Sequence, residues 1–171
     1  METKPVQEEV SAEEAAAQQA AAEAEAAARE AEDVRLAEER AMEEARLLEE
    51  AAMMAAAAQM RAFETENVYF DFDKYVLRPD AMAILDEKAA WLRDNPEVRV
   101  LIEGHADERG SNEYNLALGD RRANSAKDYL VRSGVAANRL TTISYGEEQP
   151  VCMQHNESCW WRNRRAVFVI R

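Results

Sequence analysis

Two residues of opposite charge stand at a spacing that could hold a zwitterionic ligand. Asp107 lies in a short polar loop, and Arg122 follows fifteen residues later, in a stretch where Asn115, Leu118 and Arg122 recur at helical spacing. A carboxylate and a guanidinium at a strand–helix turn can bind a ligand that carries both an ammonium and a carboxylate, and free amides at the helix N-terminus add donors. We expect Asp107 and Arg122 to be exposed, so that replacing either leaves the fold intact. The alternative is an ordinary loop with solvated charges.

His105, Asp107 and Glu108 also invite a metal or catalytic interpretation. A zinc site needs three or four ligands, and strand alternation points only His105 and Asp107 to one side. The neighbouring carboxylates of Asp107 and Glu108 point apart, and no nucleophile with a positioned base accompanies them. We therefore expect no enzyme activity, no metal and no other cofactor.

The chain has two cysteines, Cys152 and Cys159, with His155 between them. In a reducing compartment they could be free thiols or two ligands of a metal. In an oxidising compartment, a pair within one loop is typical of a disulfide.

The elements that must position these residues follow from the apolar pattern. We predict strands at residues 68–73, 98–103, 140–144 and 166–170, and helices at residues 79–95, 112–133 and 158–163. Pro79 suits the first position of a helix, and Gly134 suits the position that ends one. Strands separated by helices predict an α+β fold, an αβ sandwich in the order βαβαβ(α)β.

Composition divides the chain into two parts, residues 1–62 and 63–171. The first holds 22 Ala and 15 Glu, no aromatic residue, and 16 acidic against 6 basic side chains. Residues 11–62 are strong helix formers apart from Ser11, Asp33 and Val34, and they predict a long helical extension. Val34, Ala41, Leu48 and Ala55 recur every seven residues, but large apolar residues are scarce. We expect a solvated helical spacer, with a self-associating coiled coil as the alternative.

The second part, residues 63–171, is nearly balanced in charge, with 18 acidic and 15 basic side chains. That balance argues against nucleic acid as a partner, because phosphate binding favours a basic surface. The sequence begins with no apolar leader segment and contains no apolar run long enough to span a bilayer.

Five ordered motifs in this second part resemble the OmpA-like peptidoglycan-binding domain, and within it the branch that serves the Tol–Pal system. They are VYFDFDK at 68–74, EGHADERG at 103–110, YNLALGDRRA at 114–123, SYGEEQP at 144–150 and NRRA at 163–166. The resemblance implies an OmpA-like domain with a mixed sheet over residues 63–171.

The resemblance also implies a role for particular residues. Asp107 and Arg122 would hold the diaminopimelate of the peptidoglycan stem peptide, the first through its ammonium and the second through its carboxylate. Asn115 would add a polar contact and Leu118 an apolar wall. Weaker candidates for binding are Arg165, Asp71 and Phe72.

At the level of the cell, the resemblance implies non-covalent peptidoglycan binding that tethers the outer membrane to the wall in envelope integrity and cell division. The expected partners are peptidoglycan and the periplasmic β-propeller subunit of the Tol system. The expected location is the periplasmic side of the outer membrane, through an N-terminal lipid anchor that this chain lacks. In that oxidising compartment Cys152 and Cys159 would form a disulfide. The alternatives are a wall anchor outside the Tol–Pal system, a cell-wall hydrolase, and a coiled-coil scaffold.

Overall fold

The computed structural model describes residues 6–171, with side chains from residue 12 onward. The chain separates into two compact units, Met1–Ala55 and Ala56–Arg171. Helix α1 (Val6–Thr65) begins in the first unit and ends in the second. The sequence-based division between residues 62 and 63 stays a prediction about which part folds independently.

In the first unit, every described side chain of α1 is exposed, including Leu48 and Met53. Ion pairs one turn apart, such as Arg29 with Glu25 and Arg46 with Glu43, lie along its surface. Among the described residues, no helix is long and apolar enough to cross a membrane. The choice between a spacer and a coiled coil stays a prediction.

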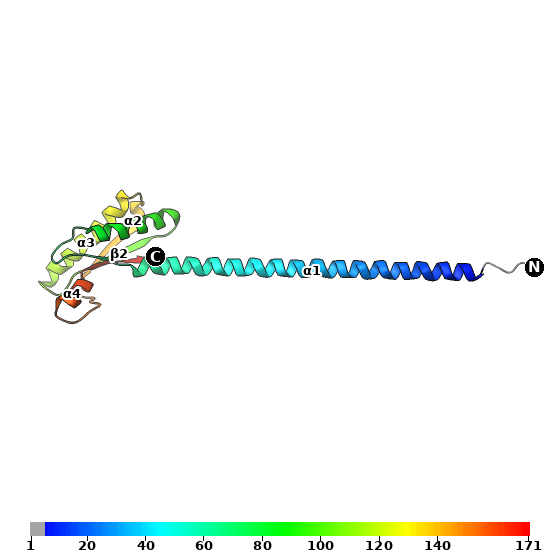
Figure 1. Cartoon of the computed structure of the whole chain (residues 1–171). Helices are drawn as coiled ribbons and strands as arrows, with labels where there is room; N and C mark the ends of the chain where they lie inside the picture. The colour runs from blue at the N-terminus through cyan, green and yellow to red at the C-terminus, as the bar shows by residue number, and fades with distance from the viewer. Residues whose placement is uncertain (1–5) are drawn as a thin grey trace, which may run out of the picture. The chain divides into compact units, whose positions relative to one another are not determined.

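The second unit contains a four-stranded mixed sheet (Figure 1). Its strands are β1 (Val68–Tyr69), β2 (Val100–His105), β3 (Leu140–Gly146) and β4 (Arg165–Ile170), in the order β1-β4-β2-β3. Strands β2 and β3 are parallel, and β4 runs antiparallel to both β1 and β2. The predicted α+β class and mixed sheet are confirmed.

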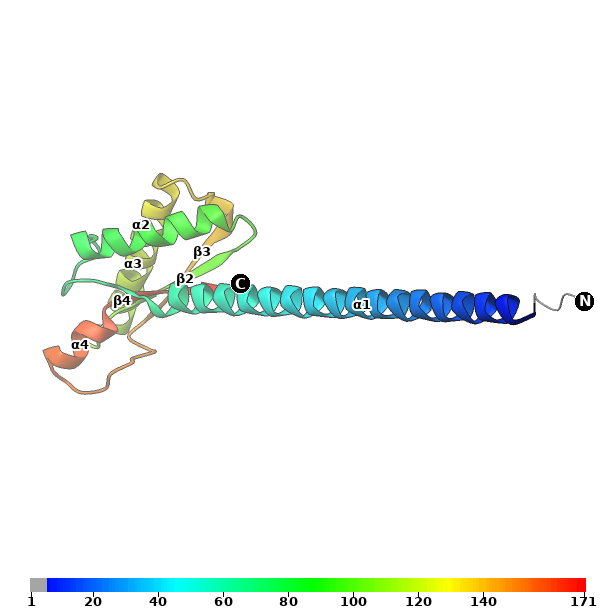
Figure 2. The same ribbon diagram turned by 45° about the vertical axis from the view of Figure 1, so that its right-hand side comes forward.

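Helices α2 (Pro79–Asp94) and α3 (Asn112–Arg132) cover one face of the sheet, as Figure 2 shows. A 3-10 turn (Ala137–Arg139) and the short helix α4 (Glu157–Asn163) complete the unit. Gly134, with a φ of 95°, follows α3 and ends it as predicted. The apolar core between helices and sheet includes Val68, Leu85, Leu92, Ile102, Ala126, Leu130 and Phe168.

One predicted strand is wrong in length. We expected a strand over residues 68–73, but β1 ends at Tyr69. The alternation of Phe70 and Phe72 suggested a strand, yet the chain turns at Asp73, whose φ is 55°. The carbonyls that a longer strand would pair are taken by side chains instead: Arg164 donates to the carbonyl of Phe70, and Arg122 to that of Asp71.

Helix α3 approaches β2 so closely that two glycines must face each other. A Cβ on Gly104 of β2 would lie 1.8 Å from the carbonyl oxygen of Gly119 in α3. A Cβ on Gly119 would lie 2.7 Å from the carbonyl oxygen of Gly104 and 2.3 Å from the Ser144 hydroxyl. The helix and the sheet can therefore lie this close only because both positions are glycine.

We predict that Gly104→Ala lowers the free energy of unfolding by about 1–3 kcal/mol or more, because the added methyl group meets backbone that cannot move aside. Denaturant unfolding followed by circular dichroism measures the loss. The control is Asp120→Ala, at an exposed position of α3, the helix that packs against Gly104. It should change stability by less than about 0.5 kcal/mol. Equal stability of the two variants would contradict the close packing.

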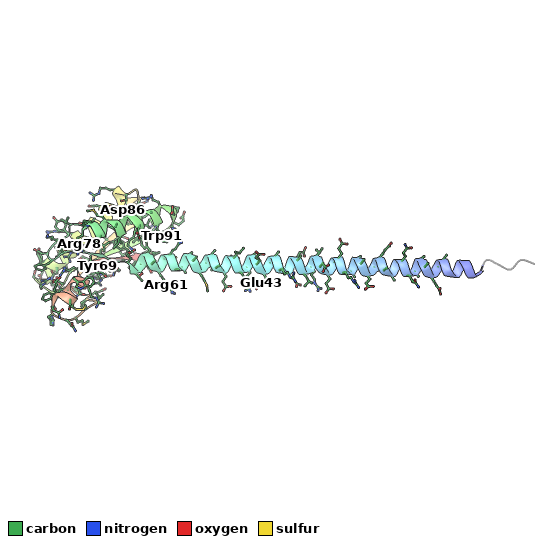
Figure 3. The ribbon with its side chains drawn as sticks, viewed as in Figure 1. Glu43, Arg61, Tyr69, Arg78, Asp86 and Trp91 are labelled. Atoms are coloured by element: carbon green, nitrogen blue, oxygen red, sulfur yellow. A yellow bond between two sulfur atoms is a disulfide. The ribbon has the colours of Figure 1, made fainter. Side chains whose placement is uncertain are left out.

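The last turns of α1 belong to the second unit through specific contacts. Phe63 is buried, with its ring centroid 4.8 Å from that of Trp91 in α2, which Figure 3 labels. The ammonium of Lys88 donates to the carbonyl of Phe63 and lies 4.4 Å from the centre of its ring. The Glu64 carboxylate accepts the backbone N–H of Ile170. All of these contacts involve residues after the predicted boundary between residues 62 and 63.

We predict that Phe63→Ala destabilises the second unit by about 3–5 kcal/mol, because it opens a cavity beside Trp91 and removes the ring beneath Lys88. Met60→Ala, on the same helix but exposed, is the matched control and should cost less than about 0.5 kcal/mol. Thermal unfolding of the full chain, monitored through tryptophan fluorescence, distinguishes them. A Phe63 variant as stable as wild type would show that α1 does not dock.

Candidate binding site

A cavity of about 280 Å³ opens between the loop after β1, the loop after β2 and the first turns of α3. Its walls are formed by Phe72, Asp73, Asp107, Arg109, Gly110, Tyr114, Asn115, Leu118 and Arg122. The two loops approach each other here because β1 and β2 both pair with β4. The cavity thus collects charged side chains that lie far apart in the sequence.

The structure brings together five of the seven residues that we predicted for binding. Those that line the cavity are Asp107, Arg122, Asn115, Leu118 and Phe72. The other two do not line it. The Asp71 carboxylate lies 3.4 Å from the Arg78 guanidinium, and Arg165 donates to the carbonyls of Asn163 and Gln149.

The first residue of α3 determines which of its side chains face the cavity. Ser111 caps the helix by accepting the N–H of Tyr114 through its hydroxyl. This start places Asn115 and Leu118 on the side that faces the cavity. The Asn115 amide is buried and donates to the Glu147 carboxylate over 2.6 Å, so its orientation is fixed.

Arg122 is fully buried, which corrects our expectation that it is exposed. Its guanidinium donates to the carbonyls of Lys74 at 2.8 Å, His105 at 2.9 Å and Asp71 at 3.1 Å. Burial lowers its pKa to about 10, and the nearby Asp107 carboxylate opposes that shift, so it stays charged at neutral pH. Removing this side chain would take a hydrogen-bond donor from each of the three carbonyls, of which that of Asp71 would still accept the N–H of Lys74. We therefore expect the loss of Arg122 to destabilise the fold, contrary to the prediction that rested on its exposure.

Asp107 is buried as well, with 4% of its surface exposed, again contrary to our expectation. Its Oδ1 accepts the backbone N–H and the Nε–H of Arg109, both over 3.1 Å. Its Oδ2 accepts from Nη2 of Arg109 at 2.6 Å and from Nη1 of Arg164 at 3.3 Å. Four donors therefore meet the roughly four lone-pair sites of one carboxylate. Burial alone would raise the pKa of Asp107, but the bonds from Arg109 and Arg164 outweigh it and lower that pKa.

The cavity and its charges can be compared with known proteins. A model described as the OmpA family matches residues 69–164, more than half of the chain. The chain belongs to the OmpA family.

Relatives and solved structures similar to this OmpA-family chain carry informative names. Proteins named peptidoglycan-associated lipoprotein are 54% identical over 105 residues in Rhizobium meliloti and 52% over 102 residues in Haemophilus influenzae. These matches cover 61% and 60% of this chain, and 60% and 67% of the relatives. The chain thus spans about three fifths of the length of several curated relatives that it matches.

Two crystal structures fit the same region. The peptidoglycan-associated lipoprotein of Burkholderia pseudomallei is 42% identical, with a TM-score of 0.60 over 61% of this chain and 89% of its own. The C-terminal domain of Helicobacter pylori MotB is 19% identical, with a TM-score of 0.58 over 62% of this chain and 84% of its own. The second likeness concerns the fold alone.

Four residues that line the cavity of this OmpA-family domain were missed from the sequence: Asp73, Arg109, Gly110 and Tyr114. The Tyr114 hydroxyl donates to the Asp73 carboxylate. The Arg109 guanidinium lies between two aromatic rings, 3.7 Å from the centre of Phe72 and 4.2 Å from that of Trp160. Asp73 directly follows the predicted site residue Phe72, and Arg109 stands two residues after Asp107, but no local pattern showed that they face the same cavity.

Sequence analysis also overlooked Arg164, a buried arginine that precedes Arg165. Arg164, in the same NRRA motif, is the one that contacts Asp107. Successive side chains of an extended chain point to opposite sides, so only one of the two can reach Asp107. Sequence alone could not decide which one, because both are followed by the same apolar strand.

His105 lies outside the cavity and is neutral. It is buried and stacks on the Tyr145 ring, 5.5 Å between centroids. Burial, together with the charge of Arg165, lowers its pKa to about 3. Among the side chains that the structure describes, residues 12–171, no group of three or more from His, Cys, Asp and Glu is arranged to hold a metal ion.

We predict that Asp107→Asn lowers the free energy of unfolding by about 1.5–3 kcal/mol at pH 7, because bonds to a charged acceptor are lost. The pKa of Asp107 is lowered in the folded state, so its contribution is present above the unfolded pKa of about 3.9 and disappears as pH falls through the folded value. Urea unfolding of both proteins between pH 2 and 7 should show the gap closing in acid. Asp120→Asn, at an exposed position, should show no such gap, and a gap independent of pH would contradict the assignment.

Proposed function

We propose that this OmpA-family chain binds peptidoglycan without covalent chemistry, and that its cavity holds the diaminopimelate of the stem peptide. The observation that carries the proposal is the pairing of charges in one small cavity. Two carboxylates, Asp73 and Asp107, and two guanidiniums, Arg109 and Arg122, line it together. The free end of diaminopimelate carries one ammonium and one carboxylate, which matches donors and acceptors of both signs. The names of the relatives support the same substrate.

The charged residues would divide the ligand between them. Arg122 uses three of its five N–H donors on backbone carbonyls, so two remain for the ligand carboxylate. Asp73 accepts from Tyr114 and keeps lone pairs for the ligand ammonium. Asp107, whose sites are filled, would attract the ammonium through its charge while Arg109 and Arg164 hold it in place. Phe72 and Leu118 would enclose the aliphatic chain between the two charged ends.

In the cell, the proposed function is that of a wall anchor. We propose a location on the periplasmic side of the outer membrane and a role in the Tol–Pal system, with its β-propeller subunit as a second partner. A wall anchor that acts outside the Tol–Pal system is the alternative, and binding to the purified β-propeller subunit separates the two. A hydrolase finds no support in the cavity, whose carboxylates are engaged by arginine or tyrosine side chains.

Co-sedimentation with insoluble peptidoglycan sacculi tests the proposal. Asp73 is exposed in the free protein. We predict that Asp73→Asn weakens binding roughly tenfold or more, since a hydrogen bond to a charged group contributes about 1.5–3 kcal/mol. Asparagine tolerates the positive φ at this position, so the backbone should be unaffected.

Asp71→Asn is the matched control, because Asp71 lies two residues away but does not line the cavity. It should bind as wild type does. Equal binding by both variants, or weaker binding by the control alone, would refute the cavity as the site. Release of soluble fragments from the sacculi by the purified protein would instead show a hydrolase.

A further inference from the structure

Helix α4 is too short to be stable alone, and its position is fixed by two ties to the preceding loop. Cys159, fully buried in α4, forms a disulfide with Cys152. The Asn163 side chain accepts the N–H groups of Val151 and Cys152 and donates to the carbonyl of Cys152 over 2.7 Å. The loop and the helix are therefore clamped at both ends of α4.

The residues that α4 presents lie against the arginines of the binding site. Glu157 accepts from Nη2 and Nη1 of Arg164 at 2.5 and 3.2 Å, and lies 3.7 Å from the Arg109 guanidinium. The Trp160 ring lies beneath Arg109, and its Nε1–H donates to Glu108 over 2.8 Å. The Glu157 carboxylate thus contacts both guanidiniums, and the Trp160 indole contacts that of Arg109.

Those two guanidiniums are the ones that hold Asp107. They supply three of its four hydrogen bonds, and the backbone N–H of Arg109 supplies the fourth. Arg109 also lines the cavity. A continuous set of contacts runs from the disulfide through Glu157 and Trp160 to Arg109 and Arg164.

The contacts made by α4 lie outside the apolar core of the domain. None of the described residues of α4 belongs to the apolar core between helices and sheet. The Glu157 side chain is 61% exposed and that of Arg109 29% exposed, so their geometry depends on where the backbone of α4 is held rather than on packing around them. Opening the disulfide should loosen α4 while the sheet, α2 and α3 keep their packing.

We propose that Glu157 and Trp160 are positioning residues for the Asp107 carboxylate, and that the Cys152–Cys159 disulfide sets the affinity of the cavity through them. The inference rests on the proposed peptidoglycan binding. It gives the disulfide a role beyond closing its own loop, because it links the oxidation state of two cysteines to the arrangement of a charge cluster.

The test compares the full chain with Cys152→Ser/Cys159→Ser, Glu157→Gln and Trp160→Leu. Sedimentation with sacculi should show binding about tenfold weaker for each, and wild type treated with dithiothreitol should match the double serine variant. The change from Glu157 to Gln should add little to the double serine variant, because both act through the same contacts. Trp161→Leu is the matched control: Trp161 is next in the same helix but packs on Tyr69, 5.2 Å between centroids, and should bind as wild type.

A second readout needs no ligand. Carbon-detected NMR titration of the Asp107 carboxyl should show its pKa rising toward the ordinary value in all three variants, since Arg109 and Arg164 are less well held. Thermal unfolding, measured alongside, should show that all variants stay folded. If the double serine variant unfolds, Glu157→Gln and Trp160→Leu, which keep the disulfide, still test the inference.

Each outcome decides. Weaker binding with a raised Asp107 pKa supports the inference. Weaker binding with an unchanged pKa, or no change in either, overturns it. If oxidised wild type fails to bind sacculi while the pKa rises in the variants, the proposed function fails but the positioning role of α4 stands.

Discussion

The site depends on one buried guanidinium. Arg122 reaches from α3 to the carbonyls of Asp71 and Lys74 in the loop after β1, and to that of His105 at the end of β2. Burying a charge is costly unless its hydrogen bonds are made, and here three carbonyls from two segments supply them. The same bonds hold the loop after β1 in its turn, away from a longer pairing with β4. The Arg122 guanidinium therefore both lines the cavity and shapes two of the segments that form its walls.

Arg122 can make those contacts only because α3 lies so close to the sheet. Gly119 precedes it by one helical turn, and there the backbones of α3 and β2 meet without an intervening side chain. A larger residue at either glycine would move the start of α3 outward and carry Arg122, Asn115 and Leu118 with it. The rigid part of the site is thus the α3–β2 contact. The other wall is made by Phe72 and Arg109. It depends on partly exposed side chains and on the short helix α4, whose Trp160 ring contacts the Arg109 guanidinium.

Sequence reasoning found the elements well and the environment of the site poorly. Strands β2, β3 and β4 and helices α2, α3 and α4 were predicted within about two residues of their observed ends, because each carries a local apolar period and a local start or stop signal. Arg109, which makes three of the four hydrogen bonds to Asp107, is only two residues away. The burial of Asp107 and Arg122 was missed because their other partners are distant. Arg164 lies 57 residues after Asp107, and Lys74 lies 48 residues before Arg122. The family motifs located these residues without showing whether their charges face water or each other.

The balance of charges in the cavity bears on which ligands it can select. Asp73 and Asp107 are matched by Arg109 and Arg122, so the cavity has donors and acceptors of both charges and no large excess of either. A simple amine could satisfy a carboxylate, but it would desolvate the spare N–H donors of Arg122 without replacing their water. A simple carboxylate could pair with Arg122, but it would remove water from the Asp73 carboxylate without supplying a donor in its place. Only a ligand that offers both groups at the right separation avoids both penalties, so selectivity arises as much from what each partial ligand leaves unpaired as from what the full ligand binds.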